Sequence, residues 1–153
     1  MTLPSNALVL VADGRKALFL RNQGNDRQID LRTTSHQERE DRKDSDIKTD
    51  ASGQSPAPAG TGLPGGTMGE ADFHQQEEYR FARELAEKIN AMALAGKFDA
   101  LVVVAPARTM GELRPLWHKE TSTRIVGEHV KEMTDRPISD IEALLVGEGA
   151  HPS

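Results

Sequence analysis

A long helical pattern that runs directly into a wholly apolar segment constrains the fold of this chain more than any other feature. Asp72 and Gln75 form a capping-box pair that predicts the start of the helix, and Gly96 predicts its end. The apolar positions of the pattern are Phe81, Ala82, Leu85, Ala86, Ile89 and Met92, a spacing typical of a helix with one buried face. The segment Leu101–Ala105 follows and is apolar on both faces, like a strand in the middle of a sheet. These features predict an α/β domain.

The length of 153 residues is that of one domain with a sizeable core. We expect this domain to span residues 1–147, with a mobile insertion at 37–70 and a frayed tail at 148–153. The insertion joins a densely charged half to a half rich in Gly, Pro, Ala, Ser and Thr, so it cannot bury enough apolar surface to offset the entropy of ordering it. It is either a tolerated surface loop or a segment that orders on a partner.

Charge and composition argue against several classes of protein. A formal net charge of −5 argues against general affinity for nucleic acid, DNA included, or for anionic lipid. The chain has no cysteine, and hence neither disulfides nor a thiolate metal site. Residues 1–6 lack a basic segment followed by an apolar run, and the longest apolar run, 100–105, is too short to cross a bilayer. We therefore expect a cytoplasmic protein with no membrane insertion.

Four more strands are predicted besides the central one. Three of them precede the long helix, and one lies near the end of the chain. Residues 7–12 and 17–20 are apolar runs separated by an Asp-Gly pair, which is typical of a hairpin turn in which both residues adopt positive φ. Residues 28–34 alternate weakly and predict an outer strand, as do residues 124–133 near the end of the chain.

Two further helices are predicted from capping boxes. Thr109 begins a short helix, and Ser139 begins a last helix that Gly147 ends. Because crossovers are right-handed and both wholly apolar strands belong in the centre, the strand order 3-2-1-4-5 is favoured. Strand 2 is then antiparallel to the others, and helices cover both faces of this mixed five-stranded sheet. This is the ribonuclease H-like topology.

In this topology four connections emerge on one edge of the sheet, where open α/β sheets bind ligands. The candidate ligand residues are Asp13, His74, Arg108, Thr109, Asp135 and Arg136. Arg108, beside a helix start at Thr109, would suit a phosphate or carboxylate, with a solvated surface arginine as the alternative. Asp13 is explained as a turn residue, with a catalytic carboxylate as the alternative.

No catalytic constellation is predicted. Ribonuclease H-like nucleases need several carboxylates on their central strands to hold Mg²⁺, but the first strand has no acid before Asp13 and Leu101–Ala105 has none. The five histidines share no HxH or HxxxH spacing, so no metal site is predicted. The glycine-rich run at 60–69 lacks the Lys-Ser/Thr of a phosphate loop, which favours a flexible linker. No cofactor is expected.

A set of segments outside the insertion follows one known pattern: Leu8–Ala17, Phe73–Ala86, Phe98–Pro106, Gly111–Arg114, and Lys131–Thr134 followed by Pro137. In these segments the chain resembles the bacterial host attachment protein family, named for proteins required for attachment to host cells in plant-associated bacteria. That family is similar to the central domain of the archaeal–eukaryotic type of peptide release factor. The resemblance therefore also implies a ribonuclease H-like fold.

In those release factors, a Gly-Gly-Gln tripeptide on the loop before the long helix reaches the ribosomal peptidyl-transferase centre. The loop of this chain reads Gly65, Gly66 and Thr67, and the glutamine is missing. The resemblance thus implies a partner-binding loop at these residues and does not extend to hydrolysis of peptidyl-tRNA.

We therefore expect a non-enzymatic binding module of the host attachment protein family, with an unknown protein partner. One alternative is a ribosome-associated, release-factor-like protein that lacks the catalytic tripeptide, for which the ribosome is the partner. The other is a hydrolase for a small phosphorylated ligand bound at Arg108.

Overall fold

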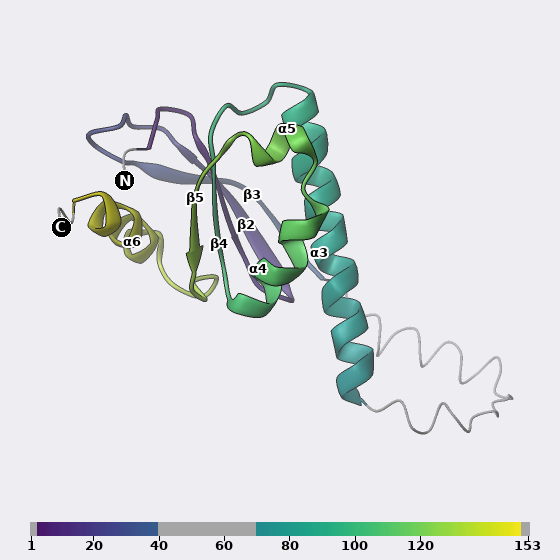
Figure 1. Cartoon of the computed structure of the whole chain (residues 1–153). Coiled ribbons are helices and arrows are strands. Elements are labelled where there is room, and N and C mark those ends of the chain that lie inside the picture. The colour runs from purple at the N-terminus through teal and green to yellow at the C-terminus, as the bar shows by residue number, and fades with distance from the viewer. Residues whose placement is uncertain (1–2, 40–69, 151–153) are drawn as a thin grey trace, which may run out of the picture.

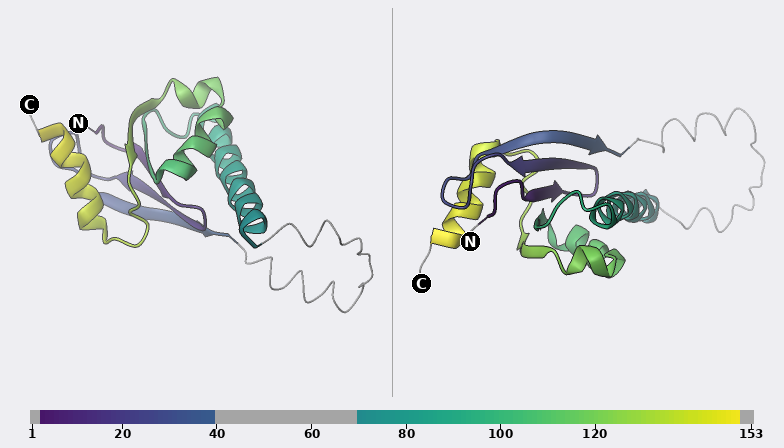
Figure 2. Two further views of the ribbon diagram at one scale, coloured as in Figure 1. Left: turned by 60° about the horizontal axis from the view of Figure 1, so that its bottom comes forward. Right: turned by 90° about the horizontal axis from the view of Figure 1, so that it is seen from above.

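A computed structural model describes residues 3–39 and 70–150 and shows a five-stranded sheet with helices on both faces (Figures 1 and 2). For residues 70–72 and 148–150 only the backbone is described. The strands are β1 (Leu8–Ala12), β2 (Lys16–Asn22), β3 (Leu31–Glu38), β4 (Leu101–Ala105) and β5 (Ile125–Val130). The helices are α3 (Glu70–Leu94), α4 (Ala107–Leu113), the 3₁₀ turn η1 (Arg114–Leu116), α5 (Lys119–Ser122) and α6 (Ile138–Ala150).

The sheet has the strand order β3-β2-β1-β4-β5, which confirms the predicted order. β2 is antiparallel to both of its neighbours, β1 and β3. β4 is parallel to both of its neighbours, β1 and β5. β2 therefore runs against the other four described strands, as predicted, and the two wholly apolar strands lie side by side in the centre.

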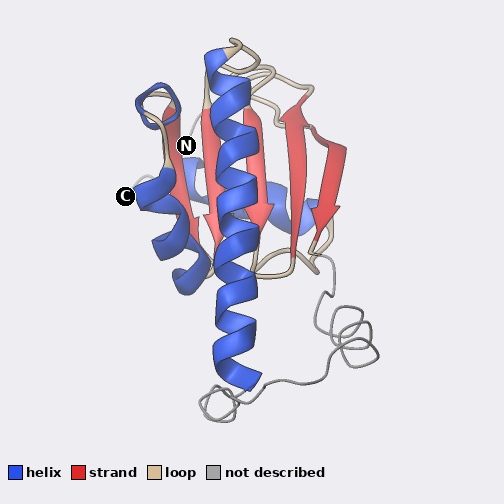
Figure 3. Cartoon of the chain, turned by 90° about the vertical axis from the view of Figure 1, so that its right-hand side faces the viewer, coloured by secondary structure: helices blue, strands red, loops and turns tan. Residues whose placement is uncertain are grey.

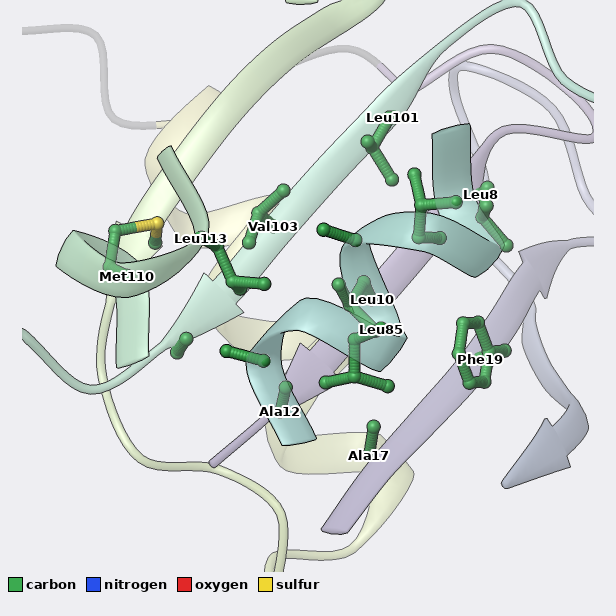
Figure 4. Packing of buried hydrophobic residues seen from close by; sticks show 14 of the residues in the cluster. Leu8, Leu10, Ala12, Ala17, Phe19, Leu85, Leu101, Val103, Met110 and Leu113 are labelled. Atoms are coloured by element: carbon green, nitrogen blue, oxygen red, sulfur yellow. The ribbon is translucent and has the colours of Figure 1, made fainter. Parts of the chain in front are cut away.

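Both faces of the central strands are buried because side chains alternate along a strand. Leu8, Leu10 and Ala12 belong to the cluster under α3 and α4. Val9 and Val11 belong to the cluster under α6 on the opposite face, and all five side chains are wholly buried. Figure 4 shows the cluster on the α3 side, to which β1, β2, α3, β4 and α4 contribute.

Helix α3 lies over the sheet, runs along the direction of the strands, and continues beyond one end of the sheet (Figure 3). Its 25 residues give a length of about 37 Å, whereas the longest strand, with eight residues, spans about 26 Å. None of the described helices, α3 included, has the length and apolar character needed to cross a membrane.

The predicted end of α3 is confirmed, and its predicted start is wrong. Gly96 has a φ of 70°, and the N–H of Lys97 donates to the carbonyl of Met92 (2.9 Å), as in a Schellman cap. The helix begins at Glu70, so Asp72 lies within it and is not the N-cap. Glu and Ala, which precede Asp72, both favour helix and extend it.

The hairpin between β1 and β2 is confirmed, but the turn differs from the prediction. Neither residue of the Asp-Gly pair adopts positive φ. Instead the Oδ1 atom of Asp13 accepts hydrogen bonds from the N–H groups of Arg15 (2.7 Å) and Lys16 (2.8 Å). These bonds form an Asx turn. The N–H of Asp13 also donates to the carbonyl of Lys16 (2.9 Å), so Gly14 and Arg15 lie at the tip of the turn in place of Asp13 and Gly14.

Both outer strands have boundaries that differ from the predictions. β3 occupies 31–38 and not 28–34, because the N–H of Gln23 donates to the carbonyl of Asp30 (2.8 Å) and closes the loop before the strand begins. β5 covers only 125–130 of the predicted 124–133.

Helix α4 begins at Ala107, so the capping box predicted at Thr109 is wrong. Thr109 lies inside the helix and is only 3% exposed. Pro106 is the N-cap, and its carbonyl accepts the N–H of Met110 (2.8 Å). The fixed φ of proline suits a residue at the start of a helix.

Helix α6 likewise follows a proline, and its predicted bounds are wrong. It begins at Ile138, so Ser139 lies within it, and the carbonyl of Pro137 accepts the N–H of Asp140 (2.9 Å). The helix passes through Gly147 to Ala150 and does not end at that glycine. The short helix α5 was not predicted.

Candidate functional site

The ends of β1 and β3 and the segment after β5 meet at one edge of the sheet, around a hollow of about 360 Å³. We call this hollow the carboxyl-edge basin. It is lined by Asp13, Arg15, Lys16, Glu38, Arg39, Glu132 and Asp135. All seven residues are charged, and two of them, Asp13 and Asp135, are predicted ligand residues. The basin therefore lies at the edge where a ligand site is expected from the topology.

Asp13 holds two segments of the basin together. Its Oδ1 atom accepts the N–H groups of the β1–β2 turn, and its Oδ2 atom accepts the hydroxyl of Thr134 (2.5 Å). Thr134 lies in the segment between β5 and α6 and is only 5% exposed. Because both carboxylate oxygens are engaged, Asp13 acts as an anchor between the turn and this segment.

Lys16 and Asp135 make a second link between the same two segments. The Nζ atom of Lys16 lies 2.5 Å from Oδ1 of Asp135. The hydrogen bond to Asp135 is the main cause of the raised pKa of Lys16, and partial burial opposes it. Since the Asp135 side chain is 76% exposed, solvent screens the pair, and its contribution to stability is small.

Four charged side chains remain on the rim of the basin. Arg15 and Glu132 are exposed, and neither side chain makes a hydrogen bond or ion pair with another described residue. The same holds for the side chain of Glu38. The guanidinium of Arg39 contacts only a backbone carbonyl, that of Gly14, at 3.5 Å. These groups are therefore available to a partner.

Arg108 does not line the basin, and two carboxylates face it. Its Nε atom lies 3.5 Å from Oε1 of Glu78 and 3.7 Å from Oε2 of Glu112. Burial raises the pKa of Glu112, and the positive charge of Arg108 opposes this rise. Glu78 also covers Gly14, where a Cβ atom would lie 2.8 Å from the glutamate side chain. The prediction of an anion site at Arg108 therefore gains no support from the geometry.

The other predicted site residues are dispersed. Thr109 is buried within α4 and cannot offer a helix N-terminus to a ligand. Arg136 lies 3.6 Å from Asp140 in an exposed i,i+4 pair and does not line the basin. His74 lies on α3, where its ring packs edge-on against Phe73 with centroids 6.1 Å apart. The predicted loop residues Gly65, Gly66 and Thr67 lie outside the described residues.

The chemistry of the basin is that of paired charges. Three cations and four carboxylates line it, which gives a formal charge of −1. Within residues 3–39 and 70–150, no three His, Cys, Asp or Glu side chains lie together in a way that could hold a metal ion. The arrangement can form several salt bridges with a ligand or partner.

Five basin residues were not predicted: Arg15, Lys16, Glu38, Arg39 and Glu132. Lys16 pairs with Glu38 in the register of β2 and β3, and the N–H of Arg39 donates to the carbonyl of Arg15 (2.6 Å). This pairing would have been visible in the sequence only if β3 had been extended to residue 38.

The chain matches a known family model. The model of bacterial archaeo-eukaryotic release factor family 12 matches residues 6–145. The chain therefore belongs to this family, and the predicted relation to release factors is confirmed at that level. Host attachment is not part of this match. No curated protein matches the chain.

Proposed function

We propose that this chain is a non-enzymatic ribosome-binding protein that contacts its partner through the carboxyl-edge basin. The observation that carries the proposal is the rim of the basin, where exposed charged side chains are available to a partner. The fold that carries this rim belongs to a family named for release factors. Asp13, Lys16 and Asp135 are engaged with protein groups and hold the basin in shape. The rim is therefore suited to binding.

The ribosome is favoured as the partner because the matching family is named for release factors, whose substrate complex is the ribosome. A ribosome-binding role places the chain in the cytoplasm. Hydrolysis is not part of the proposal, because the loop sequence Gly65, Gly66 and Thr67 lacks the glutamine of the release-factor tripeptide.

Cosedimentation with purified bacterial ribosomes tests the binding part of this proposal. We expect the intact chain to enter the ribosome pellet in a saturable manner, and to leave it as salt rises, since exposed ion pairs are screened. A chain that stays in the supernatant at low salt would refute ribosome binding.

A peptide-release assay tests the non-enzymatic part. Ribosomes that carry a labelled peptidyl-tRNA should release no more label with the chain than with buffer. Release that rises with the concentration of the chain would show that it is an enzyme.

A role in attachment to host cells is the second candidate. It is supported by the resemblance of Leu8–Ala17 and Phe73–Ala86 to the host attachment protein family. Deletion of the gene should then reduce attachment, and complementation with a chain altered at the basin should not restore it. Normal attachment of the deletion strain would refute this role.

A further inference from the structure

We propose that the carboxyl-edge basin binds a ribosomal protein surface that carries both acidic and basic side chains, and that it does not bind the RNA backbone. This inference rests on the proposed function, because it names the component of the ribosome that touches the basin.

The net charge of the basin argues for protein and against RNA. Its three cations are outnumbered by four carboxylates, and the whole chain carries a formal charge of −5. Binding to a phosphate backbone depends on clustered Lys and Arg that displace counterions. The basin has no such excess of positive charge, so a polyanion would be repelled as much as attracted.

The pairing of charges within the basin also favours a protein surface over an RNA backbone. Asp13 accepts the Thr134 hydroxyl, and Lys16 pairs with Asp135, so these charges are already satisfied. The rest of the lining consists of Arg15, Glu38, Arg39 and Glu132, two charges of each sign, and none of these side chains makes an ion pair within the basin. A phosphate backbone could pair with the two arginines but would face two carboxylates. A surface with both signs could pair with all four groups.

The position of the rim is fixed by the backbone. The N–H of Arg39 donates to the carbonyl of Arg15 (2.6 Å), which holds the two arginines on adjacent segments. Glu38 lies opposite Lys16 in the register of β2 and β3. Because the pattern of charges is set before binding, a partner needs to order only the side chains of the rim.

The experiment reverses one charge of each sign and measures binding to two probes. The basin variants are Arg15→Glu and Glu132→Lys, since both side chains are exposed and make no described contact. The matched controls are Arg27→Glu and Asp26→Lys, which lie on the exposed β2–β3 loop at the other end of the sheet. The probes are purified bacterial ribosomes and protein-free ribosomal RNA, and a thermal melt checks that each variant folds.

We expect the intact chain to bind ribosomes and not free ribosomal RNA at the same salt concentration. Both basin variants should bind ribosomes at least roughly fivefold more weakly, and both controls should stay within about twofold. The double variant Arg15→Glu/Glu132→Lys keeps the net charge of the chain, and it should bind at least as weakly as the weaker of the two single variants.

Three results would overturn the inference while leaving ribosome binding intact: equal binding to free RNA, tighter binding by Glu132→Lys, or restored binding by the double variant. The first two would identify RNA as the partner, and the third would mean that only net charge matters. If the intact chain binds neither probe, the proposed function itself fails, and this inference fails with it.

Discussion

Replacing Asn22 with alanine should destabilise the fold more than any other single polar substitution that we consider. Asn22 is the last residue of β2 and is only 1% exposed. Its side chain makes five hydrogen bonds of 2.9 to 3.3 Å: Oδ1 accepts from the N–H groups of Gly24 and Asp30, and Nδ2 donates to the carbonyls of Leu3, Pro4 and Asn25. It therefore joins the N-terminal segment to the β2–β3 loop.

The expected cost of Asn22→Ala is about 2–4 kcal/mol. A typical buried hydrogen bond contributes about 1 kcal/mol net. The two N–H groups of Nδ2 are shared among three carbonyls, so the side chain makes the equivalent of about four full bonds, and the upper value is about 4 kcal/mol. The carbonyl of Pro4 keeps a second donor, the N–H of Ala7 at 3.1 Å. Several of the bonds are only partly buried, so water can replace them in the variant.

Urea denaturation followed by circular dichroism would measure this cost. The midpoint should fall while the slope m stays unchanged. Asn25→Ala is the matched control, since Oδ1 of Asn25 also accepts two backbone N–H groups but lies on the exposed loop; we expect it to cost about 1 kcal/mol or less. Equal costs for the two variants would mean that burial of the Asn22 network does not matter, and the reasoning would be wrong.

Three further predictions rest on burial, space and charge. Leu85→Ala should cost about 2–5 kcal/mol because the side chain is wholly buried, whereas Glu84→Ala on the outer face should cost under about 0.5 kcal/mol; similar unfolding midpoints would refute the assigned face of α3. Gly24→Ala should destabilise the fold because its Cβ would lie 2.0 Å from a backbone carbonyl oxygen. Gly111 lies in α4, and a Cβ there would meet no atom within 4 Å, so Gly111→Ala should stabilise the fold by about 0.5–1 kcal/mol in the same denaturation assay. Burial raises the pKa of Glu112, so the folded state favours its protonated form and loses that contribution as pH rises. Glu112→Gln should therefore gain stability relative to the parent at neutral pH and show no gain near pH 4, which urea denaturation at the two pH values would check; an equal difference at both would contradict this sign.

The central strands can be predicted from the sequence because every residue in each of them is apolar, so burial on both faces follows from the segment itself. Leu8–Ala12 and Leu101–Ala105 are apolar at every position, and only a strand covered on both faces can bury such a run. The apolar stripe of α3 identifies its buried face for the same reason. Right-handed crossovers then leave few ways to connect the elements, and the predicted strand order follows.

Predictions at the edges of the fold fail where contacts distant in sequence decide the structure. β3 is mostly exposed and polar, so its pairing with β2 sets its bounds more than its own pattern does. Helix α5 is only four residues long. Asn90 of α3 holds it in place by accepting the N–H of His118 (2.8 Å) and the hydroxyl of Thr121 (2.6 Å). No local pattern signals such contacts.

The structure brings only some of the predicted site residues together, for a related reason. The topology correctly brings Asp13 and Asp135 to one edge, because strand ends follow from strand order. The role of an arginine depends on its neighbours, and Arg108 faces Glu78 from a helix about 30 residues away in sequence. In the sequence Arg108 has no evident counter-ion and so suggests an anion site. In the folded chain, Glu78 and Glu112 are its counter-ions.

The basin combines a fixed frame with a free rim, and this combination determines what kind of binding it can support. Asp13 and Lys16 tie the β1–β2 turn to the segment after β5, and Glu78 passes over the same turn to reach Arg108. Each exposed salt bridge that the rim forms contributes at most about 1 kcal/mol. Affinity from the rim alone is therefore modest and sensitive to salt. Specificity must come from the pattern of signs, because a partner with the wrong pattern meets repulsion as well as the loss of attraction.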